Sequence, residues 1–163
     1  FYKKKFIKKN FKAKKISLEL ARLKSKSVSK NTKNKLVIGS DTVIFFKNKF
    51  LSKASTLKDA EKKIKEISGK KHKIFSSVSA HYNNKEVWSH TQQSTVKIRR
   101  LNNNDIKLYL SKTGKGILGC VGCYQLENMG PNIIEDINGD FFNVMGFPLF
   151  PFLKFLKKYK QQR

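Results

Sequence analysis

The stretch Leu36-Val37-Ile38-Gly39-Ser40-Asp41-Thr42-Val43-Ile44-Phe45-Phe46 is the most apolar run in a very basic chain. The valine, isoleucine and phenylalanine residues at both ends of the run suit a buried strand. Residues 39–42 form a polar interruption, and an aspartate is costly to bury unless another group pairs with it. The pattern therefore predicts either a strand–turn–strand hairpin, in which Asp41 bonds its own backbone, or a strand that carries a site.

The composition limits the classes of partner. The chain of 163 residues is long enough for one domain with a core, and no apolar run is long enough to cross a bilayer. Its formal net charge is +25, almost entirely from lysine. Base readout and bidentate phosphate binding favour arginine, which occurs only at Arg22, Arg99, Arg100 and Arg163. Solvated lysine faces are thus preferred to a dedicated nucleic-acid surface, and the charge favours small polyanions such as nucleotides.

Cys120 and Cys123 form a C-x-x-C pair. One pair cannot complete a four-ligand zinc site, and the residues that follow read as a strand or bend, unlike the helix after a thioredoxin-like pair. We interpret the two as buried structural thiols, and two cysteines without a secretion signal favour a reducing cytoplasm. His72, His81 and His90 match no metal-ligand spacing, so each is expected to be structural or exposed.

Capping residues and apolar periodicity predict a mixed α/β domain. Residues 1–16 read as a basic amphipathic helix or a frayed end. The expected helices start at the N-caps Ser17, Thr56 and Asn104 and at Pro148, and the first three end near Ser29, Gly69 and Gly114. The expected strands are 72–82 and 86–100, joined by a turn at 82–85, and a later strand that ends at Asn138-Gly139. The buried stripes are expected to be Leu20, Ala21, Leu23 and Val28 in the first helix and Phe152, Leu153, Phe155, Leu156 and Tyr159 in the last.

Five segments, in order, resemble signature segments of the Maf family of nucleoside triphosphate pyrophosphatases. They are residues 37–43 (family IGADTVV), 51–53 (LGKP), 67–74 (LSGRxHxV), 122–127 (GAYxIQ or GAYxIE) and 139–149 (GDYxNVxGLPL). The resemblance implies a single domain over residues 1–163 with the α/β fold of Maf and ITPase-like proteins. That fold is a mixed twisted β-sheet flanked by helices, with two lobes around a central cleft.

Two features of the family pattern are missing from the sequence. The family opens with an SxSPRR phosphate-binding loop, which does not occur here, so we expect an amino-terminal truncation. An acidic pair also precedes the family's first helix, whereas Lys3-Lys4-Lys5 stands at that place. The chain as given is therefore expected to lack one catalytic or metal-binding carboxylate.

The resemblance also assigns roles to residues. The family hydrolyses a nucleoside triphosphate to a monophosphate and pyrophosphate with a divalent cation, Mg²⁺ or Mn²⁺. Asp41 matches the catalytic proton acceptor and a metal ligand, Thr42 a substrate-contacting position, and Lys24 and Lys53 the phosphate-facing lysines. Glu127 matches a position that is Gln in members acting on dTTP and UTP and Glu in the 7-methyl-GTP members. Without the resemblance, the lysines would read as surface amines and Glu127 as the cap of a turn at 128–130.

The preferred hypothesis is a cytoplasmic enzyme that removes modified or non-standard nucleotides, of the 7-methyl-GTP type, with dTTP or UTP as the alternative substrate. The expected partner is the nucleoside triphosphate, with no membrane and no specific nucleic acid, and the family often forms homodimers. The alternatives are a non-catalytic nucleotide- or RNA-binding module and an inactive fragment.

Overall fold

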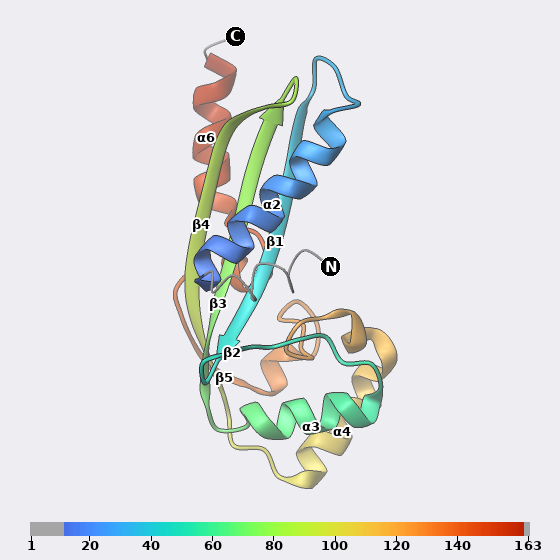
Figure 1. The fold of residues 1–163 in the computed structure, drawn as a ribbon. Coiled ribbons are helices and arrows are strands. Elements are labelled where there is room, and N and C mark those ends of the chain that lie inside the picture. The colour runs from blue at the N-terminus through green and yellow to red at the C-terminus, as the bar shows by residue number, and fades with distance from the viewer. Residues whose placement is uncertain (1–11, 162–163) are drawn as a thin grey trace. The chain divides into compact units, whose positions relative to one another are not determined.

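The structure is a computed structural model that describes residues 12–161, so the expectations for residues 1–11, including Lys3-Lys4-Lys5, lie outside it. The described chain forms helices and strands in alternating groups (Figure 1). In order, these are α2 (Ala13–Ser29), β1 (Leu36–Phe46), β2 (Lys49–Phe50), α3 (Leu57–Ile67), β3 (Lys71–Tyr82), β4 (Lys85–Ile98), α4 (Asn103–Thr113), the 3₁₀ helices η1 (Gly114–Gly119) and η2 (Gly130–Asn132), β5 (Ile134–Asn138), α5 (Phe141–Val144) and α6 (Leu149–Gln161).

The strands form one sheet in the order β2-β1-β3-β4-β5. Strands β1 and β2 pair antiparallel with Phe45 opposite Phe50, and β4 and β5 pair antiparallel with Val96 opposite Ile137. Strands β3 and β4 are joined at Asn83-Asn84, whose positive φ angles of 47° and 64° are those of a type I′ turn. The predicted mixed α/β class and the predicted hairpin are therefore confirmed.

The central stretch of the sequence is one continuous strand of 11 residues. The hairpin interpretation of residues 39–42 is therefore wrong. The tight turn follows the strand instead, at Lys47-Asn48, where both φ angles are positive at 44° and 61°. Because Asp41 lies inside a regular strand, its side chain projects from one face of the sheet and does not fold back to cap a turn.

The chain divides into two compact units. Unit 1 comprises the described residues up to Val43, Phe75–Gln93 and the residues from Gly146 on; unit 2 comprises Ile44–Ile74 and Ser94–Met145. A cleft between two lobes stays a prediction. Among residues 12–161, none of the helices combines the length and the apolar character that a membrane span requires.

In unit 1, helix α2 packs against β1 and β3 through small side chains at every fourth position. These are Ala13, Ser17, Ala21, Ser25 and Ser29, all buried. Two expectations are corrected. The helix begins at Ala13, and Ser17 is no N-cap because its hydroxyl is buried against Ser77 at 2.7 Å. Of the expected stripe only Ala21 is buried, while Val28 is 55% exposed.

Helix α6 covers the opposite face of the strands of unit 1. Ser77 of β3 and Thr91 of β4 bond each other on the face that meets Ser17 of α2. Odd-numbered and even-numbered residues of a strand face opposite sides, so Trp88 of β4 faces away from α2. Its ring stacks on Phe155 of α6, with the ring centroids 4.8 Å apart. No residue of α6 is fully buried, and Leu153 is 48% exposed, so the expected buried stripe is a half-buried one.

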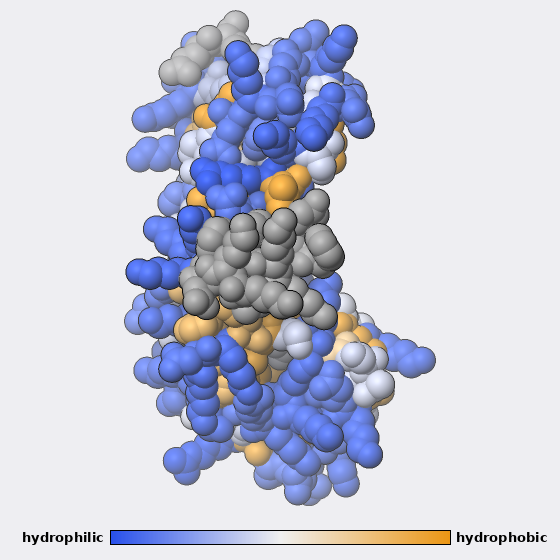
Figure 2. Space-filling view, in the orientation of Figure 1, coloured by the Kyte–Doolittle hydropathy of each residue, from blue (hydrophilic) through white to orange (hydrophobic). Residues whose placement is uncertain are grey.

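Unit 2 has an apolar core beneath α3 and α4. Ile64, Ile67, Ile74, Ile98 and Ile106 are almost completely buried there. Thr56 caps α3 as predicted, since its hydroxyl accepts from the Asp59 amide. Helix α4 is capped by Asn102 and not by Asn104, because Asp105 completes a capping box with Asn102. Most of the described lysines are exposed, as predicted for solvated lysine faces. Most of the surface visible in Figure 2 is hydrophilic.

Candidate active site

Asp41 of β1 and Lys24 of α2 form an ion pair in unit 1. The Lys24 Nζ atom lies 2.6 Å from Asp41 Oδ1 and donates a second bond, 2.8 Å long, to the Ser40 carbonyl. The Asp41 side chain is 18% exposed and the Lys24 side chain 56% exposed. The carboxylate is therefore sheltered but reachable, and more than half of the Lys24 side chain is open to solvent. The structure thus brings together two of the sequence-predicted residues.

Gly39 allows this pair to form because it lets the helix approach the strand. A Cβ atom at Gly39 would lie only 2.5 Å from both the Ala21 carbonyl oxygen and the Ser25 amide nitrogen. Any side chain there would push α2 outward. Lys24 precedes Ser25 in the same turn of α2. The close contact at Gly39 therefore brings Lys24 within ion-pair distance of Asp41.

Thr42 lies on the other face of β1, as expected for the residue next to Asp41 in a strand. Its hydroxyl is 2.9 Å from Ser76 Oγ and donates to the Gly146 carbonyl at 3.3 Å. Ser40, on the same face, donates to that carbonyl at 2.9 Å. The two hydroxyls tie β1 to the start of the final segment. The sequence reasoning missed Ser40, Ser76 and Gly146, although the two-residue period of β1 predicts that Ser40 and Thr42 share a face.

Lys53 and Glu127 belong to unit 2, and their sharing of a cleft with Asp41 stays a prediction. Lys53 is exposed, and its backbone carbonyl accepts a 2.9 Å bond from Lys63 Nζ of α3. Lys63 also bonds Ser52 Oγ at 3.1 Å and Asp59 at 2.9 Å. The segment that carries Lys53 is therefore fastened to α3, while its own ammonium group faces solvent.

Glu127 stands at the tip of a turn that closes on the Gln125 carbonyl. That oxygen accepts bonds from the Gly130 amide at 2.8 Å and the Asn128 amide at 3.2 Å. The turn amides are thus used by Gln125, which removes the reason to interpret Glu127 as the cap of the turn. The Glu127 side chain is exposed, whereas Leu126 beside it is buried.

The three histidines are structural or half-buried. His72 is buried beside Tyr124, with Nε2 2.6 Å from the phenolic oxygen, and burial lowers the pKa of His72 to about 4. His81 is buried with Nδ1 2.9 Å from Ser25 Oγ, and desolvation lowers its pKa. His90 stacks on Trp88, and desolvation also lowers its pKa. Within the described part of the chain, no three His, Cys, Asp or Glu side chains form a metal-binding group.

The buried His72 predicts a loss of stability in mild acid. Its folded-state pKa lies below the unfolded value, so the unfolded chain takes up the proton first as the pH falls below 6.5. The free energy of unfolding should therefore decrease by about 2 kcal/mol between pH 7.5 and pH 5 through His72 alone. His81 and His90 act in the same direction. Urea unfolding at a series of pH values measures the slope.

His72→Phe is the control for that slope, because it removes the titrating group while it leaves His81 and His90 in place. The variant should start from a lower stability and lose less of it between pH 7.5 and pH 5. An unchanged slope in His72→Phe would assign the acid sensitivity to other groups.

The cysteines occupy a turn and are both free thiols. The Cys123 amide donates to the Cys120 carbonyl at 3.4 Å, and burial raises the pKa of Cys123 to about 11. Cys123 is therefore a buried structural thiol as predicted, whereas Cys120 is partly exposed. Residues 124–126, which follow the pair, form no strand, so the alternative of a strand there is wrong and the bend is right.

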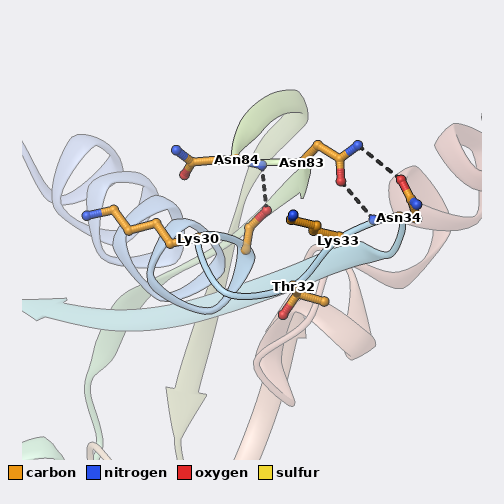
Figure 3. Close-up of a pocket in the computed structure, with 7 residues that line it drawn as sticks. Lys30, Thr32, Lys33, Asn34, Asn83 and Asn84 are labelled. Carbon is orange, nitrogen blue, oxygen red and sulfur yellow. Dashed lines mark hydrogen bonds between the residues drawn. The ribbon is translucent and has the colours of Figure 1, made fainter.

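Two hollows lie beside α2 in unit 1. One, of about 300 Å³, is lined by residues of the α2–β1 loop and the β3–β4 turn (Figure 3). There the Asn34 amide donates to the Asn83 side chain and the Asn84 amide donates to the Ser29 hydroxyl, so these polar groups hold two turns together. None of the predicted site residues lines this hollow. The other, of about 360 Å³, follows the outer face of α2 past Lys24 and is lined by Leu20, Leu23, Lys24, Lys26, Ser27 and Lys30.

The fold and the acid–lysine pair thus describe an α/β protein with a site suited to a phosphate-bearing substrate. Residues 2–159 match the family described as "Maf-like protein". The chain belongs to this family. It is 32% identical over 141 residues to the "Nucleoside triphosphate pyrophosphatase" of Granulibacter bethesdensis. The aligned residues are 86% of this chain and 72% of that protein.

Two further relatives carry a more specific name. The "7-methyl-GTP pyrophosphatase" of Bartonella quintana is 36% identical over 140 residues, or 86% of this chain and 71% of that protein. The protein of the same name from Rhizobium meliloti is 32% identical over 143 residues, or 88% of this chain and 72% of that protein.

Proposed function

We propose that this protein is a nucleoside triphosphate pyrophosphatase, which hydrolyses a nucleoside triphosphate to a nucleoside monophosphate and pyrophosphate. The observation that carries the proposal is the pair of Asp41 and Lys24, a sheltered carboxylate 2.6 Å from a half-exposed ammonium. The names of the relatives support the same reaction. Lys26 and Lys30 line the hollow beside Lys24, so further positive charge is available for a triphosphate.

In the proposed mechanism, Asp41 orients a water molecule and accepts its proton as the water oxygen attacks the α-phosphorus. The bond from the α-phosphorus to the bridging oxygen breaks, and pyrophosphate leaves with the electron pair of that bond. Lys24 holds the Asp41 side chain in place, and its exposed side offers hydrogen bonds to phosphate oxygens. Lys53 is proposed to bind the leaving phosphates. Thr42 lies on the face of β1 opposite Asp41, where its hydroxyl fixes Gly146, so its contact with the substrate stays a prediction.

The donor chemistry fits a divalent cation that arrives with the substrate. Asp41 offers a hard carboxylate oxygen, and Mg²⁺ is commonly held by one or two carboxylates together with substrate phosphates. We propose Asp41 as the protein ligand for Mg²⁺ or Mn²⁺, which would neutralise charge on the phosphates when bound.

Glu127 supports a guanine-type substrate. A carboxylate accepts two N–H bonds, and the guanine Watson–Crick edge presents two adjacent donors. Methylation at N7 adds positive charge to the base, which a carboxylate also favours. A uracil or thymine edge instead presents one N–H between two carbonyl oxygens. We therefore propose 7-methyl-GTP as the preferred substrate and dTTP or UTP as the alternative.

The homodimer and the cytoplasmic location stay predictions.

The test is pyrophosphate release from a panel of 7-methyl-GTP, GTP, UTP, dTTP and ATP, with Mg²⁺ or Mn²⁺ and with neither. We expect metal-dependent, stoichiometric pyrophosphate and monophosphate from at least one nucleotide, with the highest kcat/KM for 7-methyl-GTP. Release of inorganic phosphate alone would contradict the bond that we propose is broken. No turnover, together with tight and steeply salt-dependent polynucleotide binding, would favour the RNA-binding alternative.

Replacing Lys24 by methionine should separate catalysis from stability. Loss of a charged hydrogen bond to phosphate should lower kcat/KM about 10–100-fold. The free energy of unfolding should change by less than about 1 kcal/mol, because the Lys24 side chain is largely exposed. Lys14→Met, an exposed position on the same helix but outside the hollow, is the matched control and should keep full activity. Equal losses in both variants would assign the effect to general charge.

A further inference from the structure

The segment of residues 122–130, called here the Glu127 loop, begins in an unusual backbone conformation. Gly122 has a φ of 83°, and Cys123, which has a side chain, has a φ of 60°. A Cβ atom at Gly122 would lie 2.9 Å from Ile44 Cδ1 and 3.1 Å from Tyr124 Cε1. A left-handed non-glycine residue persists where its surroundings fix it. The two positive φ angles turn the chain so that the next side chain, Tyr124, points into the core of unit 2.

Tyr124 meets His72 of β3 inside that core. The phenolic oxygen lies 2.6 Å from His72 Nε2, and both side chains are buried. Burial lowers the pKa of His72 to about 4, so the ring is neutral near pH 7. The other ring nitrogen, Nδ1, is buried without a hydrogen-bond partner in the described structure. The contact with Tyr124 is therefore the hydrogen bond that holds this imidazole, and it links the sheet to the loop.

Contacts within the loop hold its backbone between Tyr124 and Gly130. Leu126 is buried, and the Gln125 carbonyl accepts the amides of both Asn128 and Gly130. A Cβ atom at Gly130 would lie 2.4 Å from the Gln125 oxygen, so the turn closes tightly. Glu127 is exposed at the tip of this framework, three positions after Tyr124, as is Asn128 beside it. Glu127 is thus carried on a turn that Tyr124 and Leu126 anchor in the core of unit 2.

We propose that the His72–Tyr124 hydrogen bond positions Glu127 and thereby sets the preference of the enzyme for a guanine over a pyrimidine base. This inference rests on the proposed function. His72 and Tyr124 are positioning residues, since they act through Glu127. A two-point contact between a carboxylate and the guanine edge depends on orientation, so a mobile Glu127 weakens guanine recognition more than it weakens phosphate binding.

The test compares kcat/KM for 7-methyl-GTP with kcat/KM for UTP in Tyr124→Phe, which removes one hydroxyl and keeps the ring. We expect the ratio of the two values to fall about tenfold, with kcat/KM for UTP within about twofold of wild type. His72→Phe should behave in the same way. His72→Gln, whose amide can reach the position of Nε2, should restore part of the preference.

The dependence on Glu127 is tested by repeating Tyr124→Phe in a Glu127→Gln background. If the anchor acts through Glu127, the double variant should show the ratio of Glu127→Gln alone. A further tenfold fall in the double variant, or an equal loss for both nucleotides in Tyr124→Phe, would overturn the proposal. Ile106→Val, a change in the same core that leaves the pair intact, is the control for general destabilisation and should keep the wild-type ratio.

Amide hydrogen exchange separates this inference from the proposed function. In Tyr124→Phe, the amides of Asn128 and Gly130 should exchange about tenfold faster than in the wild type, and in Ile106→Val they should not. This readout needs no turnover. If the wild type hydrolyses no nucleotide, the proposed function fails, and the exchange rates still decide whether the pair holds the loop. Unchanged exchange in Tyr124→Phe would overturn the positioning role.

Discussion

Asp41→Asn should lower kcat by about 10²–10⁴-fold with little change in the fold. The amide has almost the shape of the carboxylate, but it cannot accept the proton of the attacking water and binds a divalent cation poorly. The side chain is partly open to solvent and lies in a regular strand, so the substitution leaves no unfilled space. Single-turnover pyrophosphate release and urea unfolding measure the two effects separately.

Asp136→Asn is the matched control, since it makes the same chemical change at an exposed position of β5. It should retain kcat within about twofold, because a change of charge at an exposed residue that is not among the proposed site residues alters little. Full activity in Asp41→Asn would remove the catalytic assignment. An equal fall in both variants would indicate an effect of net charge.

Gly39→Ala should destabilise the protein by at least about 3 kcal/mol, at the upper end of the range for overpacking. The added methyl would lie 2.5 Å from two backbone atoms of α2, the Ala21 oxygen and the Ser25 nitrogen, and backbone atoms cannot rotate away. The melting temperature should fall by about 6–12 °C for a chain of this size. Because the helix must move outward, Lys24 should also separate from Asp41, and kcat/KM should fall.

Gly119→Ala is the control for the loss of glycine itself. A Cβ atom there would meet nothing within 4 Å, and the residue does not have a positive φ angle. Its melting temperature should stay within about 2 °C of the wild type, or rise slightly. A small effect of Gly39→Ala would show that α2 packs more loosely on β1 than these contacts indicate.

The parts of the fold that follow from local rules were predictable. Thr56 is followed by an acid three residues later, and Asn83-Asn84 accepts the positive φ angles of a hairpin turn, so neighbouring residues decide both structures. The start of α2 was not predictable in this way. Apart from Ile16, its buried face consists of alanine and serine, which resembles a solvent-exposed pattern until β3 supplies hydroxyl partners such as Ser77.

The candidate site was predictable from the resemblance and not from spacing. Asp41 and Lys24 lie 17 positions apart on a strand and a helix, and only the packing at Gly39 brings them together. The His72–Tyr124 bond joins residues 52 positions apart. A lone histidine among many lysines gives no sign of such a partner, so long-range polar pairs of this kind need the folded chain.

The division into two units has a consequence for synthesis. The chain passes from one unit to the other after Val43, Ile74, Gln93 and Met145, and the first three crossings fall within β1, β3 and β4. No single cut in the polypeptide yields either unit whole. Unit 1 needs residues from Gly146 on, which leave the ribosome after every residue of unit 2. Its assembly must therefore wait until unit 2 has been synthesised, so a chain stalled after residue 145 would hold β1 and α2 without the segment that Ser40 and Thr42 bind.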